Sequence, residues 1–166
     1  MYYFSYSANI SVAWFQTRVE SAEPLDIYEL HGYCLKFNKI GNDDSSKANA
    51  VYTGNPDDSI WGVVYEVAEE DLHKLEQSYY NSTTQGYVRK DIMVEVEYEP
   101  CAALMYVAQD DFIDNNLKPY SWYVFHLLHG AISAGFPMEY VGMLQNVDAI
   151  TDTNIQRACN ENEVYA

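Results

Sequence analysis

The sequence predicts a single α+β domain in which strands and helices are intermixed. Residues 87–99 and 101–108 alternate apolar and polar positions on either side of Pro100, which is typical of two antiparallel strands. The chain lacks the sustained strand–helix alternation that a doubly wound parallel sheet requires. Its 166 residues, 48% of them hydrophobic, suit one domain with a sizeable core.

The N-terminal part is expected to run strand, helix, strand. Residues 2–6 are predicted to form a short apolar strand, and residues 11–19 a short helix, because their apolar side chains recur at helical spacing. Strand character returns in residues 23–38, where apolar and polar positions alternate. The polar stretch 38–49 is expected to be a loop because of its composition.

The middle of the chain contains the clearest strand pattern. Residues 48–54 predict a short strand, and residues 60–68 predict a longer one that includes Gly62. A glycine inside a strand indicates a bulge or a close approach by another part of the chain. A helix is expected over 69–79, since acidic residues crowd its first turn, where they interact favourably with the helix dipole.

Two helices are predicted in the last third of the chain. Pro119 lies near the start of the first helix, Gly135 is expected to end it, and Pro137 is expected to begin the second. The final stretch is polar and loses its periodicity. We therefore expect a domain over 1–149 and a polar C-terminal tail over 150–166 that frays.

Composition excludes several classes of function. The net charge of −16 argues against nucleic acid and anionic membranes as partners, because phosphates are bound by lysine and arginine, and it favours solubility. No apolar run approaches the ~18 residues that a membrane helix needs. The N-terminus does not resemble a signal peptide, so a cytoplasmic protein is expected. The cysteines are few and widely spaced, which argues against a disulfide framework or a metal site: Cys34, Cys101 and Cys159.

Four segments resemble, in order, the motifs of the γ-glutamylcyclotransferase family, which includes the AIG2-like proteins. Each motif is weak alone, but four of them in the right order and at the right spacing make a specific match. They are "YFSYSANI" at 3–10, "IWGVVYEV" at 60–67, "DLHKLEQSYYNSTTQGYVR" at 71–89 and "YSWYVFHLLHGAISAGFPMEYVGML" at 120–144.

The resemblance implies a small closed mixed β-barrel flanked by helices, with a cavity at one end. It also implies an enzyme of lyase or acyltransferase type that binds a γ-glutamyl or other amino-acid-like small molecule. In this reaction the α-amine of the substrate attacks its own γ-carbonyl and releases 5-oxoproline and an amine, so proximity supplies much of the rate. No metal or organic cofactor is implied, and a homodimer is left open.

The resemblance places substrate binding in the turn after the first strand. In the family, main-chain N–H groups of this turn face the oxygens of the substrate. Here the family glycine is replaced by serine, which would be strained if the position required a positive φ, and the family serine is replaced by alanine. A plain turn capped by the asparagine is the structural alternative. The residues concerned are Tyr6, Ser7, Ala8, Asn9 and Ile10.

The catalytic glutamate of the family has no direct counterpart. When Leu72 and Leu75 are aligned with the two leucines of the family motif, Tyr79 falls on the catalytic glutamate and Glu76 on the preceding aspartate. A tyrosine with the ordinary pKa of ~10 can donate a hydrogen bond but does not readily accept a proton from an ammonium group. A register shifted by three residues would make Glu76 the acid–base residue.

Further alternatives remain at this point. A carboxylate from elsewhere, Glu66 or Glu139, could reach the site, or the chain could be a catalytically silent relative that binds a small amino-acid-like ligand or keeps only the fold. Tyr106 and Tyr123 match family tyrosines near the substrate, although each could equally be a core tyrosine whose hydroxyl has a partner.

Overall fold

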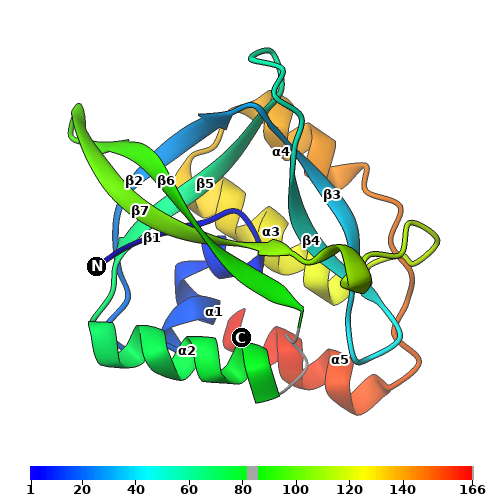
Figure 1. Ribbon diagram of the computed structural model, residues 1–166. Helices are drawn as coiled ribbons and strands as arrows, with labels where there is room; N and C mark the ends of the chain where they lie inside the picture. Colours follow the sequence, from blue (N-terminus) through cyan, green and yellow to red (C-terminus); the bar gives the residue numbers. More distant parts are fainter. Residues whose placement is uncertain (82–85, 166) are drawn as a thin grey trace.

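The computed structural model describes residues 1–81 and 86–165, and of residues 77–81 the backbone alone. Within these residues the strands form a five-stranded sheet of order β2-β5-β1-β7-β6 and a separate β3-β4 ladder (Figure 1). The strands are β1 (Tyr2–Ser5), β2 (Glu23–His31), β3 (Tyr33–Ile40), β4 (Ser46–Tyr52), β5 (Ser59–Glu66), β6 (Tyr87–Val96) and β7 (Glu99–Ala108).

The helices gather on one side of the strands and at the lower end of the molecule in Figure 1. None of those that the structure describes is long and apolar enough to cross a membrane. They are α1 (Val12–Gln16), α2 (Glu69–Asn81), α3 (Ser121–Ala134), α4 (Met138–Gln145) and α5 (Ile155–Asn162), with the 3₁₀ turns η1 (Ala8–Ile10), η2 (Asp110–Phe112) and η3 (Glu163–Tyr165).

The α+β class is confirmed, but the barrel is not closed. The five-stranded sheet ends at β2 on one side and at β6 on the other, and β3-β4 is a separate ladder. Strand β2 carries Pro24 and a register shift between Pro24 and Asp26, and proline has no N–H to donate to a further strand. The β2 edge of the sheet therefore contains Pro24, which opposes closure of the sheet into a barrel.

The stretch predicted as one strand over 23–38 is two strands. Gly32 has a φ of 80°, a left-handed conformation that glycine adopts without strain, and it separates β2 from β3. The loop expected over 38–49 is also shorter than predicted, because β3 continues to Ile40 and β4 begins at Ser46. Antiparallel pairing of these two strands supplies hydrogen-bond partners that composition does not reveal.

The long central hairpin is confirmed, with its turn in a different place. Strands β6 and β7 are antiparallel, and the turn lies at Glu97 and Tyr98, whose φ angles are 52° and 67°. Two consecutive residues with positive φ are the mark of a tight hairpin turn that follows the twist of the strands. Pro100 lies within β7, opposite Glu95.

Strand β1 carries the chain from the middle of the sheet into the turn that was predicted to bind substrate. It is antiparallel to β5 and parallel to β7. Helix α3 packs directly on this turn: a Cβ added to Gly130 would lie 2.5 Å from the main-chain nitrogen of Ser11. Gly135, with a φ of 77°, ends α3, and Pro137 precedes α4, as predicted. The core includes Phe4, Phe15, Ile60, Tyr65, Leu72, Leu104, Leu127 and Leu144.

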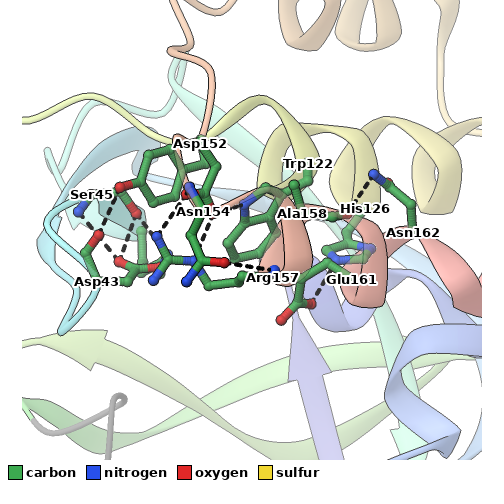
Figure 2. Close-up of polar contacts among 12 residues, drawn as sticks. Asp43, Ser45, Trp122, His126, Asp152, Asn154, Arg157, Ala158, Glu161 and Asn162 are labelled. Carbon is green, nitrogen blue, oxygen red and sulfur yellow. Dashed lines mark hydrogen bonds and ion pairs between the residues drawn. The ribbon is translucent and has the colours of Figure 1, made fainter.

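The prediction that the C-terminal segment frays is wrong. Asp152 is buried and accepts two hydrogen bonds from Arg157, at 2.6 and 2.7 Å, and one from the indole of Trp122 at 2.9 Å (Figure 2). The side chain of Asn154 caps the start of α5. This segment docks through polar contacts, so a search for apolar periodicity does not detect it.

Candidate functional site

A cavity of about 470 Å³ opens beside the turn that follows β1. Its walls come from this turn and from side chains of α1, β4, β6, β7, α3 and α5. Most of the predicted binding residues line it, namely Tyr6, Ser7, Ala8, Asn9, Tyr106 and Tyr123. Ile10 does not: it is buried in the core, and its N–H donates to the carbonyl of Ser7 at 2.9 Å.

The turn is unstrained and presents main-chain donors. Ser7 has a φ of −102°, so replacement of the family glycine by serine costs no strain here. The N–H groups of Ala8 and Ala48 point to the phenol oxygen of Tyr123, the latter at 3.0 Å. Among the described residues, the N–H groups of Ser7 and Asn9 donate to no protein acceptor.

Asn9 holds the turn to the sheet and does not cap the following helix. Its side chain donates to the hydroxyl of Tyr3 at 3.2 Å, and its carbonyl accepts from the hydroxyl of Tyr65 at 2.8 Å. The capping residue of α1 is Ser11, whose Oγ accepts from the N–H of Trp14 at 3.4 Å. The alternative in which Asn9 serves as a helix cap is therefore wrong.

The three predicted tyrosines keep their phenol protons at neutral pH. Burial raises the pKa of Tyr6, Tyr106 and Tyr123, and the hydrogen bond to Glu76 raises that of Tyr106 further. Tyr6 donates to the carbonyl of Tyr106 at 2.5 Å, and Tyr106 donates to Oε1 of Glu76 at 2.9 Å. Each hydroxyl therefore has a protein partner, as a buried tyrosine requires.

Glu76 lies behind the wall of the cavity and is hydrogen-bonded to Tyr106, a residue of that wall. It comes from α2 and lies four residues after Leu72, whose burial turns this face of the helix toward the core. It does not line the cavity itself but reaches it through Tyr106, and His73 lies 3.5 Å from its second oxygen. The side chain of Tyr79 lies outside the described residues.

The two carboxylates considered as substitutes do not line the cavity. Glu66 is exposed at the end of β5, and Glu139 is exposed in the first turn of α4. Neither is among the residues of the cavity wall. Both alternatives from the sequence are therefore wrong.

A charged wall faces the tyrosines and was not predicted. Lys47 of β4 donates to Asp43 at 2.7 Å and to Ser45 at 2.8 Å. Its Nζ lies 4.9 Å from the ring centroids of both Trp122 and Tyr123, a cation–π arrangement. Burial lowers the pKa of Lys47, and the bond to Asp43 opposes that change. Lys47 falls in the stretch expected to be a loop, and no sequence signal distinguishes it.

Helix α5 completes the cavity with Arg157 and Glu161, which are four residues apart and lie on one helical face. Oε2 of Glu161 lies 3.3 Å from Nε2 of His126, a fully buried residue of α3 (Figure 2). The indole of Trp14 stacks on this imidazole, with ring centroids 4.3 Å apart. The i, i+4 spacing was the only signal available for these residues, and it is common in exposed helices.

Comparison with known proteins agrees with the fold. The model of the AIG2-like family matches residues 59–144, just over half of the chain. A solved γ-glutamyl cyclotransferase is 21% identical, with a TM-score of 0.78 over 97% of this chain and 98% of its own. An uncharacterized human protein is 20% identical, with a TM-score of 0.76 over 96% and 97%.

A more distant structure shares the fold as well. The yeast γ-glutamyl cyclotransferase specific to glutathione is 12% identical, with a TM-score of 0.64 over 87% of this chain and 93% of its own. At these identities the likeness establishes the fold alone. No curated protein sequence is significantly similar to this chain.

Proposed function

We propose, from the premise that this chain belongs to the AIG2-like family, that it is a cyclotransferase acting on a γ-glutamyl or related amino-acid amide. The α-amine of the substrate attacks its own γ-carbonyl carbon, the bond from that carbon to the amide nitrogen breaks, and 5-oxoproline and an amine leave. Because the nucleophile and the carbonyl belong to one molecule, the protein acts mainly by orienting the ligand and by moving protons.

The observation that carries this proposal is the composition of the cavity. Ser7 and Asn9, whose main-chain N–H groups have no acceptor among the described residues, line the same cavity as Tyr106. Fixed N–H groups of this kind stabilise the carboxylate of the ligand or the negative charge that develops on its amide oxygen. A volume of about 470 Å³ is within the range for small-molecule sites.

The reaction transfers two protons between nitrogens. An attacking ammonium nitrogen keeps one of its three protons in the lactam, and the leaving nitrogen gains two. We assign one transfer to Glu76, acting through Tyr106: the phenol oxygen takes a proton from the attacking nitrogen as its own proton passes to Glu76, 2.9 Å away, and the reverse movement delivers a proton to the leaving nitrogen. Tyr79 serves as a hydrogen-bond donor in this scheme, not as the base.

The test is release of 5-oxoproline from γ-glutamyl amides by wild type, Glu76→Gln and Tyr79→Glu. We expect release by wild type and a loss in kcat of at least about tenfold for Glu76→Gln, because the proton acceptor is gone. Glu70→Gln, an exposed change on the same helix, is the matched control and should leave kcat unchanged.

Two other outcomes decide against this scheme. Binding of the amides by calorimetry without release of 5-oxoproline by wild type would identify a silent ligand-binding protein. Recovery of activity only in Tyr79→Glu would show that the site is a degenerate one, which needs a carboxylate at position 79.

A further inference from the structure

Among the described residues, two carboxylates line the cavity, and only one has a free oxygen. Both oxygens of Asp43 are engaged, one by Lys47 at 2.7 Å and the other by Ser45 at 2.8 Å. Within the part of the chain that the structure describes, Glu161 has one contact, from Oε2 to His126, and its Oε1 has no partner. Oε1 of Glu161 is therefore the carboxylate oxygen of this wall that is free to contact a ligand.

The environment of His126 fixes the position of Glu161. The imidazole is fully buried and stacked on Trp14, and both of its nitrogens have partners. Nε2 faces Glu161, and Nδ1 lies 2.7 Å from the hydroxyl of Tyr165. That hydroxyl lies 2.9 Å from Oγ of Ser11, the cap of the helix that follows the binding turn. Figure 2 shows His126 and Glu161 side by side.

This chain of contacts can hold one proton more or less without moving its heavy atoms. If Tyr165 donates to Nδ1, the imidazole is neutral and its Nε2–H points to Glu161. If Tyr165 donates to Ser11, Nδ1 carries an additional proton that it donates to Tyr165, and the proton already between Nε2 and Glu161 can lie on either of these two partners. A carboxylate coupled to an imidazole in this way is suited to accept and return a proton.

We propose that Glu161 is a second catalytic proton-transfer residue of this cavity and that His126 is its positioning residue. The inference rests on the proposed function, in which two protons pass from the attacking nitrogen to the leaving nitrogen. Glu161 takes one proton from the attacking nitrogen as the new C–N bond forms. It returns that proton to the leaving nitrogen as the old C–N bond breaks, and ends ionised as it began.

The charges that face Glu161 are compatible with this role. Lys47 from β4, Arg157 from α5 and Arg18, which follows α1, line the same cavity, in a chain whose net charge is −16. Asp43 is the opposing carboxylate, and Lys47 neutralises it. Glu161 also lies beyond residues 59–144, so it belongs to a part of the chain that the family model does not match.

The experiment measures 5-oxoproline release by Glu161→Gln, with Glu163→Gln as control. Both variants remove one charge from the C-terminal segment, but Glu163 is exposed and does not line the cavity. We expect Glu161→Gln to lower kcat by about 100-fold with KM within about threefold, because binding survives and proton transfer does not. Glu163→Gln should match wild type.

Two further variants separate chemistry from folding. Glu161→Ala should regain activity when formate is added, since a small carboxylate can occupy the vacated space and carry the proton. His126→Gln should lower kcat while leaving KM unchanged, and to a smaller extent than Glu161→Gln. If these substitutions only disturbed the fold, they would lower the unfolding midpoint, and formate would not restore activity.

The outcomes distinguish this inference from the function on which it rests. If wild type releases 5-oxoproline and Glu161→Gln does so at the same rate, the role of Glu161 is overturned and the proposed function stands. Failure of formate to restore Glu161→Ala also overturns the role, even if Glu161→Gln folds poorly. If wild type releases no 5-oxoproline from any amide, the proposed function fails and the role of Glu161 fails with it.

Discussion

Lys39 shows how a single buried cation is accommodated behind the cavity. It is 1% exposed, and its Nζ lies 4.9 Å from the ring centroid of Tyr87 and 5.9 Å from that of Phe112. Burial lowers its pKa to about 8, and the nearby charge of Lys47 adds to this effect. The aromatic faces offset part of the cost of burying the charge.

Replacing Lys39 by methionine should therefore stabilise the protein at pH 7. The folded state penalises the charged lysine fully below pH 8, and the penalty disappears as the pH rises from about 8 toward 10.5. We expect Lys39→Met to raise the free energy of unfolding by about 1–2 kcal/mol at pH 7, and the gain to shrink over that range. Denaturant unfolding at several pH values measures it.

The matched control is Lys36→Met, an exposed position on the same strand. It should change the free energy of unfolding little, and without the same pH dependence. A gain for Lys39→Met that persisted at pH 10.5 would point to better packing instead of relief of a buried charge.

The element on which the site depends most is α3, because it supports the binding turn directly. A Cβ at Gly130 would lie 2.5 Å from the nitrogen of Ser11 and 2.6 Å from the carbonyl carbon of Ile10, and backbone atoms cannot yield as a flexible side chain does. The residue at position 130 thus sets how closely helix and turn approach. A bulkier residue would move the N–H groups of the turn.

Gly130→Ala is expected to cost about 1–3 kcal/mol of stability and to weaken ligand binding. Gly142→Ala in α4 is the control, since no atom lies within 4 Å of the added Cβ and alanine is the better helix former. It should be neutral or stabilise by up to about 1 kcal/mol. Thermal unfolding and calorimetric titration with a γ-glutamyl amide measure both effects. Equal behaviour of the two variants would contradict the close packing of α3 on the turn.

At the scale of the whole molecule, positive charge is scarce and partly concentrated at the cavity. The chain has nine lysines and arginines against 25 acidic residues, and Arg18, Lys47 and Arg157 line the cavity. At neutral pH the acidic groups on most of the remaining surface therefore repel one another. The ion pairs near the cavity, Lys47 with Asp43 and Arg157 with Asp152, are partly or fully buried and are screened less by salt.

Added salt should consequently stabilise the protein. Raising NaCl from about 10 mM to about 300 mM shortens the Debye length several-fold and screens the repulsion among acidic groups. We expect the free energy of unfolding at pH 7 to rise and to level off at higher salt. Urea denaturation at each salt concentration measures it, because urea adds no ions. A decrease with salt would mean that the attractive pairs outweigh the repulsion.

Local patterns in the sequence were sufficient for most elements and for part of the site. The central hairpin follows from alternation in residues 87–108, and the end of α3 follows from Gly135. The motif around Ser7 identified the turn that lines the cavity, because its residues are contiguous. The sequence pattern does not mark Gly32 as a strand break, because alternation continues across it and a left-handed φ leaves no signature in the sequence.

The sequence by itself determined the α+β class, the family resemblance and the turn after the first strand, since each depends on neighbouring residues. Only the tertiary structure decided that the sheet is open, that the C-terminal segment is docked, and that Lys47, Arg157 and Glu161 share one cavity. The physical reason is that these features arise from pairs far apart in the chain, such as His126 with Glu161. Neither hydrophobic periodicity nor a short sequence motif reveals such pairs, because the two residues come together only when the chain folds around its core.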